Sequence, residues 1–305
     1  MQPDNVLVGL IYGVECLLVV PLHLLIVVIL LKGKEFRKPT AYRIMTHMSI
    51  IECIQMLGYL FGSIMSFFQS QIHPYFGRIG GAILSAGWIG IILFTFLLTV
   101  NRLIVFSDFK ISKLSEKKFF NWMLRGVWVT AALIFGIHLI PALSMVYIIE
   151  RNTYWFEGHE GILVGNLESY FIYAGLFVTF ILCMACVVMI IVKRNLFSTQ
   201  FKVSSGELKL FCQCFVIFLY LTVIRCMWQF GHSLGVLKSE ASYIVLGMAT
   251  EAVGGVNPFL YLLLNRSIRG HVATIFRLHK SPVSSFNVSK HYKIGAGSKS
   301  PPRTP

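Results

Sequence analysis

Four ionisable side chains lie inside long apolar runs of this 305-residue chain, and they are the first candidates for chemistry. A charge within lipid costs roughly 2.5 to 3.5 kcal/mol on insertion scales, so residues of this kind are functional candidates. The alternative is that each one faces the interior of a helix bundle and is neutralised there for structure alone. The four are Glu15, Glu52, Arg225 and Glu251. Since Arg225 and Glu251 lie near the middle of neighbouring runs, an ion pair between them is our first hypothesis.

A proline inside the last apolar run marks a second candidate, in the segment GGVNPFLYLLLNRSIRG at 254–270. Pro258 removes a backbone hydrogen bond and should kink its helix. Asn257 beside it can donate to a freed carbonyl or to a polar partner such as Glu52. A kink can simply shape a bundle, whereas in a moving protein it is a hinge between two packings.

Two polar residues, Asn101 and Arg102, end the third apolar run in the segment TVNRLIVF. Arg102 could be an interfacial arginine that extends its charged group to the lipid headgroups. Glu207, at the start of the sixth run, offers it a different partner. An ion pair between them would clamp the ends of the two helices together.

The elements that must hold these residues are membrane-spanning helices. The chain is 56% hydrophobic and only 13% charged, and windows of about 20 residues with few charges identify the spans. The predicted spans are 6–31, 41–68, 80–106, 121–148, 168–192, 208–235 and 241–264. The sequence therefore predicts an all-α membrane protein built as a seven-transmembrane helix bundle.

Basic residues give the chain a net charge of +14, and they gather in alternate loops and after Arg266. The intervening loops hold only Arg78, Arg151 and Lys238, and the fourth loop is acidic. By the positive-inside rule the N-terminus lies outside and the C-terminus in the cytoplasm. The charge therefore reflects topology and contact with anionic membrane lipids, and not the binding of nucleic acid.

The segment NRSIRGHVATIFRLH spaces its apolar residues like a helix that lies on a membrane surface. We predict a short cytoplasmic amphipathic eighth helix there, at about 265–279, as the end of a membrane domain that covers 1–280. From 281 to 305 the composition changes to Ser, Lys, Gly and Pro, which predicts a disordered cytoplasmic tail. The serines of this tail are candidate sites of phosphorylation.

The other chemistry-bearing residues predict no catalytic or metal centre. All seven cysteines lie within predicted spans, so no disulfide between outer loops is expected. The sequence has no G-x-S-x-G or H-E-x-x-H motif, and no histidine pair at the spacing of helical metal ligands. We therefore expect neither an enzyme nor a bound cofactor or metal. Small residues, including Gly58 and Gly62, should serve close helix packing.

Several of these segments resemble rhodopsin-like G-protein-coupled receptors. NPFLY at 257–261 matches the N-P-x-x-Y signature of their seventh helix, and the amphipathic stretch follows where their eighth helix would lie. Asn101 and Arg102 resemble part of the triplet that ends their third helix. Glu52 takes the place of their helix-two carboxylate, and Trp128 resembles their helix-four tryptophan.

The departures from that family are specific. The third-helix triplet lacks its acidic member, and no cysteine lies near Gly77 to form the usual disulfide. Helix six has Trp228 without the expected proline, and Glu251 stands where an opsin would carry its retinal-binding lysine. The chain is therefore not an opsin. Its YRIM segment and LLLNRSIRG ending are similar to nematode chemosensory serpentine receptors, most of all class T.

The resemblance implies a receptor that binds a small extracellular ligand and activates a heterotrimeric G protein. Arrestin or a receptor kinase would act at the serine-rich tail, and the receptor would lie in the plasma membrane, in sensory cilia if it is a chemoreceptor. Its switch residues would be Asn101, Arg102, Glu207, Glu52, Asn257, Pro258 and Tyr261. Its ligand pocket would include Glu251, Arg225, Trp228 and Tyr243. A lid would comprise Tyr154, Trp155 and Phe156, unless these aromatic residues only anchor the membrane interface.

A transporter or channel is the alternative, because carboxylates within a bundle can form ion or proton paths. That class predicts internal repeats, broken helices and a continuous polar face. None of these is visible in the sequence, so we favour the receptor.

Overall fold

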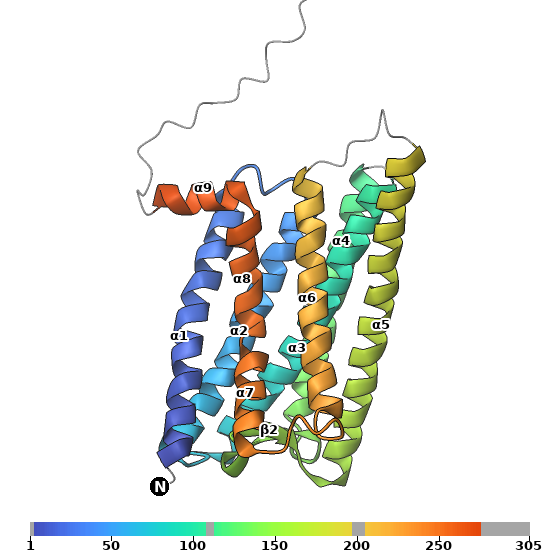
Figure 1. The fold of residues 1–305 in the computed structure, drawn as a ribbon. Coiled ribbons are helices and arrows are strands. Elements are labelled where there is room, and N and C mark those ends of the chain that lie inside the picture. The colour runs from blue at the N-terminus through green and yellow to red at the C-terminus, as the bar shows by residue number, and fades with distance from the viewer. Residues whose placement is uncertain (1–2, 108–112, 197–204, 276–305) are drawn as a thin grey trace, which may run out of the picture.

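The computed structural model describes residues 3–107, 113–196 and 205–275, and these form a helix bundle with a short hairpin across one end (Figure 1). In the described part of the chain, six helices are long and apolar enough to cross a membrane. They are α1 (Pro3–Lys32), α2 (Thr40–Phe68), α3 (Pro74–Ser107), α4 (Lys113–His138), α5 (Gly158–Leu196) and α6 (Ser205–Phe230). The seventh span is formed by two shorter helices in sequence, so the predicted membrane bundle is confirmed.

Helix α3 forms the centre of the bundle. In its most apolar window 78% of the residues are buried, compared with 22% to 50% for the other five long helices. Small residues permit its close contact with α2: a Cβ on Gly58 would lie 2.7 Å from the side chain of Leu84. The prediction that Gly58 serves helix packing is therefore confirmed.

The fourth span is shorter than predicted, because α4 ends at His138 and the run to residue 148 is not helical. Pro141 cannot continue the helix and instead begins the short 3-10 turn η1 (Pro141–Leu143). The chain then forms an antiparallel hairpin of β1 (Met145–Ile148) and β2 (Thr153–Phe156), in which Tyr147 lies opposite Tyr154. The apolar residues after Pro141 therefore cover the end of the bundle.

The seventh span is interrupted at Ala252, six residues before Pro258, where the sequence predicts a kink. Helix α7 (Glu240–Glu251) and helix α8 (Val253–Leu264) are separated at Ala252, whereas Pro258 lies inside α8. Because α8 continues as a helix through Pro258, the kink expected there stays a prediction, and the boundary at Ala252 is an additional feature. The missing donor of Pro258 affects the carbonyl one turn earlier, that of Gly254, and the pair Gly254–Gly255 has low helix propensity.

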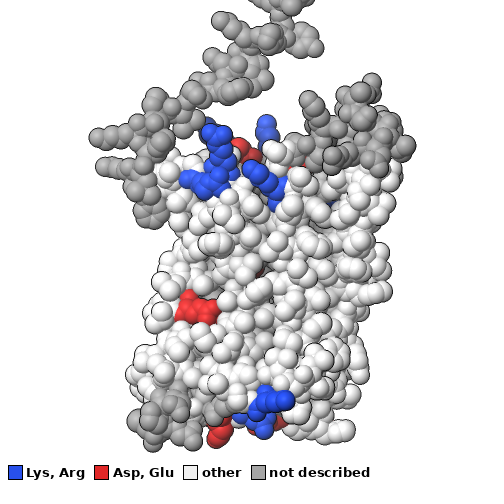
Figure 2. Space-filling model, in the orientation of Figure 1, with Lys and Arg blue, Asp and Glu red and all other residues white. Residues whose placement is uncertain are grey.

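Charged side chains lie mainly at the two ends of the bundle and are rare in its middle. Figure 2 shows basic side chains at both ends of the visible face, more of them near α9, and an almost uncharged band between. Helix α9 (Arg266–Ile275) lies across its end of the bundle with Ile268 buried and Arg266 and Arg269 exposed, as an amphipathic helix should. Its predicted continuation to 279 and the tail at 281–305 lie outside the described residues. We name the two ends the hairpin end and the α9 end.

Candidate functional site

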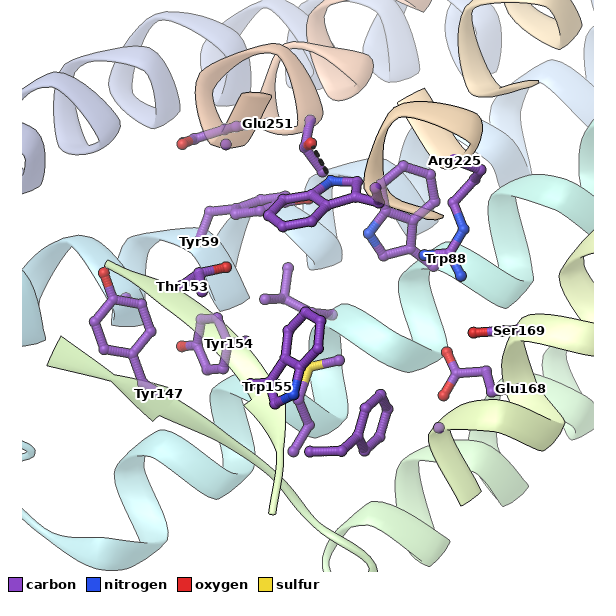
Figure 3. A pocket seen from close by; sticks show the side chains of 18 of the residues that line it. Tyr59, Trp88, Tyr147, Thr153, Tyr154, Trp155, Glu168, Ser169, Arg225 and Glu251 are labelled. Atoms are coloured by element: carbon purple, nitrogen blue, oxygen red, sulfur yellow. Dashed lines mark hydrogen bonds between the residues drawn. The ribbon is translucent and has the colours of Figure 1, made fainter. Parts of the chain in front are cut away.

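A cavity of about 430 Å³ lies between the hairpin and the helices at the hairpin end (Figure 3). Both strands contribute to its lining, together with residues of α1, α2, α3, α5, α6 and α7. Aromatic side chains dominate the wall, among them Tyr59, Trp88, Trp155 and Trp228. A cavity of this size and composition suits a small molecule.

Arg225 and Glu251 both line this cavity, but they do not form the predicted ion pair. The guanidinium of Arg225 lies 5.8 Å from the centre of the Trp88 ring, on α3. Glu251 Oε1 instead accepts a hydrogen bond from Cys16 Sγ on α1, at 2.8 Å. The hypothesis is therefore wrong, because the two side chains leave their helices toward different neighbours.

The other predicted pocket residues divide between the cavity and the outer surface of the bundle. Trp228 lines the cavity and donates from Nε1 to Thr250 Oγ1 at 2.8 Å. Trp155 also lines it, as part of β2. Tyr243 is not among the lining residues and is 37% exposed, so its assignment to the pocket is wrong. On α7 it lies seven residues before Thr250, on the same face of the helix but about 10 Å further along its axis, beyond the residues that line the cavity.

Hydrogen bonds hold the hairpin over the cavity. Ser66 Oγ donates to Asn152 Oδ1 at 2.6 Å, so its contact of 2.5 Å with Tyr147 Oη must be donated by the tyrosine. Burial raises the pKa of Tyr147, which keeps this donor protonated. Tyr154 Oη donates to the carbonyl of Gly58 at 2.9 Å. Tyr154, Trp155 and Phe156 all line the cavity, so the predicted lid residues do cover it.

We expect the hairpin to resist reducing agents, because all seven cysteines are free. Asn152→Ala removes the acceptor of Ser66, and should lower the free energy of unfolding by about 1 kcal/mol. The melting temperature of purified receptor, with and without dithiothreitol, measures both effects. Tyr75→Phe, at an exposed tyrosine of the same end, is the matched control. A marked loss of stability in dithiothreitol would contradict this account.

A buried polar cluster joins α1, α2 and α8 at mid-bundle. Asn257 donates from Nδ2 to Glu52 Oε1, and both residues are at most 1% exposed. His23 Nε2 lies 2.5 Å from the carbonyl oxygen of Gly254, and its Nδ1 lies 3.7 Å from Glu52 Oε2. The prediction that Asn257 bonds to Glu52 is confirmed. We name His23, Glu52, Asn257 and the Gly254 carbonyl the core cluster.

His23 is the member of this cluster that the sequence interpretation missed. Pro258 leaves the carbonyl of Gly254 without its helical donor, and the imidazole of His23 supplies one from another helix. Because Nε2 is then the protonated nitrogen, Nδ1 of a neutral His23 is an acceptor that faces the carboxyl group of Glu52. The available signal was a lone histidine in the middle of the first apolar run. Tyr261 is fully buried one turn after Asn257.

At the α9 end an ion pair joins α3 to α6. Arg102 Nη1 contacts Glu207 Oε2, and its Nη2 donates to Asn101 Oδ1. The side chain of Arg102 is 3% exposed and that of Glu207 is 37% exposed, so Glu207 is the accessible member of the pair. The predicted clamp between the two helices is therefore present, and we name this ion pair the clamp.

Comparisons with known proteins place the chain among receptors. A family model described as "Serpentine type 7TM GPCR chemoreceptor Srv" matches residues 12–278. The crystal structure of squid rhodopsin matches with a TM-score of 0.70 over 91% of this chain and 87% of that chain, at 14% sequence identity. At this identity the likeness shows the fold alone. No curated protein matches. The matched class is Srv, which corrects the class T suggested by two short segments.

Proposed function

This chain belongs to the Srv family of serpentine seven-transmembrane G-protein-coupled chemoreceptors, and from this membership we propose that its cavity binds a small external chemical. The observation that carries the proposal is the hairpin, which covers an aromatic cavity that reaches Glu251 at the end of α7. A site of this form is enclosed enough to select a ligand by shape. Heterotrimeric G-protein coupling follows from the family.

We place the hairpin end outside the cell and the α9 end in the cytoplasm. The distribution of lysine and arginine supports this orientation, since positive loops stay on the cytoplasmic side. The plasma membrane then gives the hairpin end access to external chemicals, and sensory cilia are the compartment that suits a chemoreceptor. The basic face of α9 would contact anionic lipids. Arrestin or a receptor kinase would act on the serines after residue 281.

A ligand can activate the receptor only if it binds one arrangement of the helices more tightly than another. Glu251 lines the cavity, and the interruption at Ala252 follows it directly. We propose that ligand binding changes the angle between α7 and α8 at this interruption. Helix α8 carries the Asn257 member of the core cluster, so the change reaches the middle of the bundle.

The same movement would open the α9 end. Tyr261 follows Asn257 along α8, and α8 contacts α6, which carries Glu207. A shift of α8 against α6 would separate the clamp and free Arg102 for contact with a G protein. In this proposal Asn101, Arg102 and Glu207 form the switch, while Pro258 shapes the α8 segment that moves.

The test is a screen of small volatile and water-soluble chemicals on cells that express the receptor with several Gα subtypes. We expect a ligand that raises a second messenger only when receptor and a matching Gα are both present. Ligand-driven current through a reconstituted bilayer without G protein would instead favour a transporter or channel. The interrupted seventh span is a feature of that class too, but the family assignment gives it no support.

A further inference from the structure

One cavity residue carries a charge that no ion pair neutralises. Among the residues that line the cavity Arg225 is the one lysine or arginine, and it forms no ion pair within the described part of the chain. Its Nε atom is buried and makes no hydrogen bond there. The carboxylate of Glu168 attracts this guanidinium without contacting it, and an anion bound directly to Arg225 would lower the cost of the partly buried charge further.

The side chains of the two carboxylates in the wall are largely buried, at 9% exposed for Glu168 and 0% for Glu251. Glu168 Oε2 lies 3.1 Å from His138 Nε2, which fixes that carboxylate between α4 and α5. Glu251 Oε1 accepts from Cys16, and its Oε2 is buried without a hydrogen bond in the described part of the chain. Arg225 is only partly buried, so the charged group that a ligand can reach is the cation.

The surroundings of Arg225 suit a planar acidic group. In Figure 3 its guanidinium extends to the side of the cavity where Ser169 lies on α5. Tyr173 Oη donates to Gln229 Oε1 at 3.2 Å, which leaves the Nε2 amide of Gln229 as a donor beside Arg225. A guanidinium binds a carboxylate through two parallel hydrogen bonds, and the neighbouring hydroxyl and amide can donate to the same oxygens.

The rest of the cavity suits an apolar body. The ring of Trp88 lies beside the guanidinium, and Trp155, Trp228 and Phe156 extend the aromatic wall. A volume of about 430 Å³ limits the ligand to a small organic molecule. Stacking and burial would hold this body while the charged group sets its orientation.

We propose that the natural ligand is a small organic acid, with its carboxylate on Arg225 and an aliphatic or aromatic body against the tryptophans. The proposal rests on the function proposed above and specifies its ligand class. It also defines what the site rejects: an amine of the same skeleton would bring a second cation to Arg225, and like charges in one cavity repel. A neutral amide would lose the charge-assisted bonds.

The experiment uses full-length receptor in lipid nanodiscs and matched sets of medium-chain and aryl carboxylic acids, primary amides and amines with the same skeletons. Binding is measured as an increase in melting temperature across a concentration series, and G-protein activation is measured in cells. We expect acids alone to bind. Arg225→Gln should weaken acid binding roughly 10- to 100-fold, as expected for loss of a charged hydrogen bond. Arg225→Glu should shift the preference to amines.

Arg78→Gln is the matched control, because Arg78 also lies beside an aromatic ring at the hairpin end but does not line the cavity. It should leave acid binding unchanged. Equal binding of amides and acids, or an undiminished response to acids in Arg225→Gln, overturns the acid proposal. If neutral or cationic compounds activate a G protein, the chemoreceptor function stands and the ligand class is wrong. If acids bind and no Gα responds, the ligand class stands and the signalling function fails.

Discussion

Receptors that carry Arg102→Ala should reach the cell surface in normal amounts and lose ligand-dependent G-protein activation completely. Arg102 is 2% exposed and is held by Glu207 and Asn101, so it is available to a G protein only after the clamp opens. The substitution removes the guanidinium, which is the group that would contact the G protein once the clamp opens. Surface labelling together with a second-messenger assay in the same cells separates loss of signalling from loss of expression.

Glu207→Gln tests the other half of the clamp. It removes the ion pair but keeps Arg102, so ligand-independent activity should rise above that of the unaltered receptor. Arg43→Ala is a matched control at the same end, since Arg43 contacts Asn121 and takes no part in the clamp. If Arg102→Ala signals normally, Arg102 is only an interfacial arginine, and the switch assigned to it is wrong.

Asn257→Leu should destabilise the receptor by about 1 to 3 kcal/mol, because it leaves the buried carboxyl group of Glu52 without its amide donor. The change should lower the melting temperature and reduce surface expression. The double variant Glu52→Leu/Asn257→Leu removes both polar groups and should recover stability, because no unpaired carboxyl group remains.

Signalling distinguishes the two variants further. The double variant should fold and yet respond weakly to ligand, because the core cluster no longer links α2 to α8. Glu52→Gln keeps an acceptor for Asn257 and serves as the conservative control. An unchanged melting temperature in Asn257→Leu, with Glu52 still in place, would show that the cluster contributes little to stability.

The helices were predictable because few backbone structures are stable within lipid. Long apolar runs must satisfy their backbone groups internally, and six of the seven spans appear as single helices. The clamp was also predictable, since the third span ends at Arg102 and the sixth begins at Glu207, on the same side of the membrane. The hydrogen bond between Asn257 and Glu52 was predictable because both residues lie deep in the bundle.

The failed ion pair has a physical cause, which is that a sequence does not give the rotation of each helix. Arg225 and Glu251 lie at matching depths, yet one faces α3 and the other α1. Tyr243 shares a face of α7 with cavity residues but lies two turns nearer the start of the helix, outside the lining. The hairpin was read as a continued helix because its apolar residues resemble a span. Its fixed position depends on tyrosines that reach α2, a contact remote in sequence.

The contact between His23 and the Gly254 carbonyl restricts which substitutions this receptor can tolerate during evolution. An ordinary residue in place of Pro258 would restore a backbone donor, and the imidazole would then compete with it for one oxygen. Loss of His23 alone would strand that oxygen inside the bundle. Exchange of both residues together avoids each problem. We therefore expect positions 23 and 258, which lie 235 residues apart in the sequence, to co-vary among related receptors.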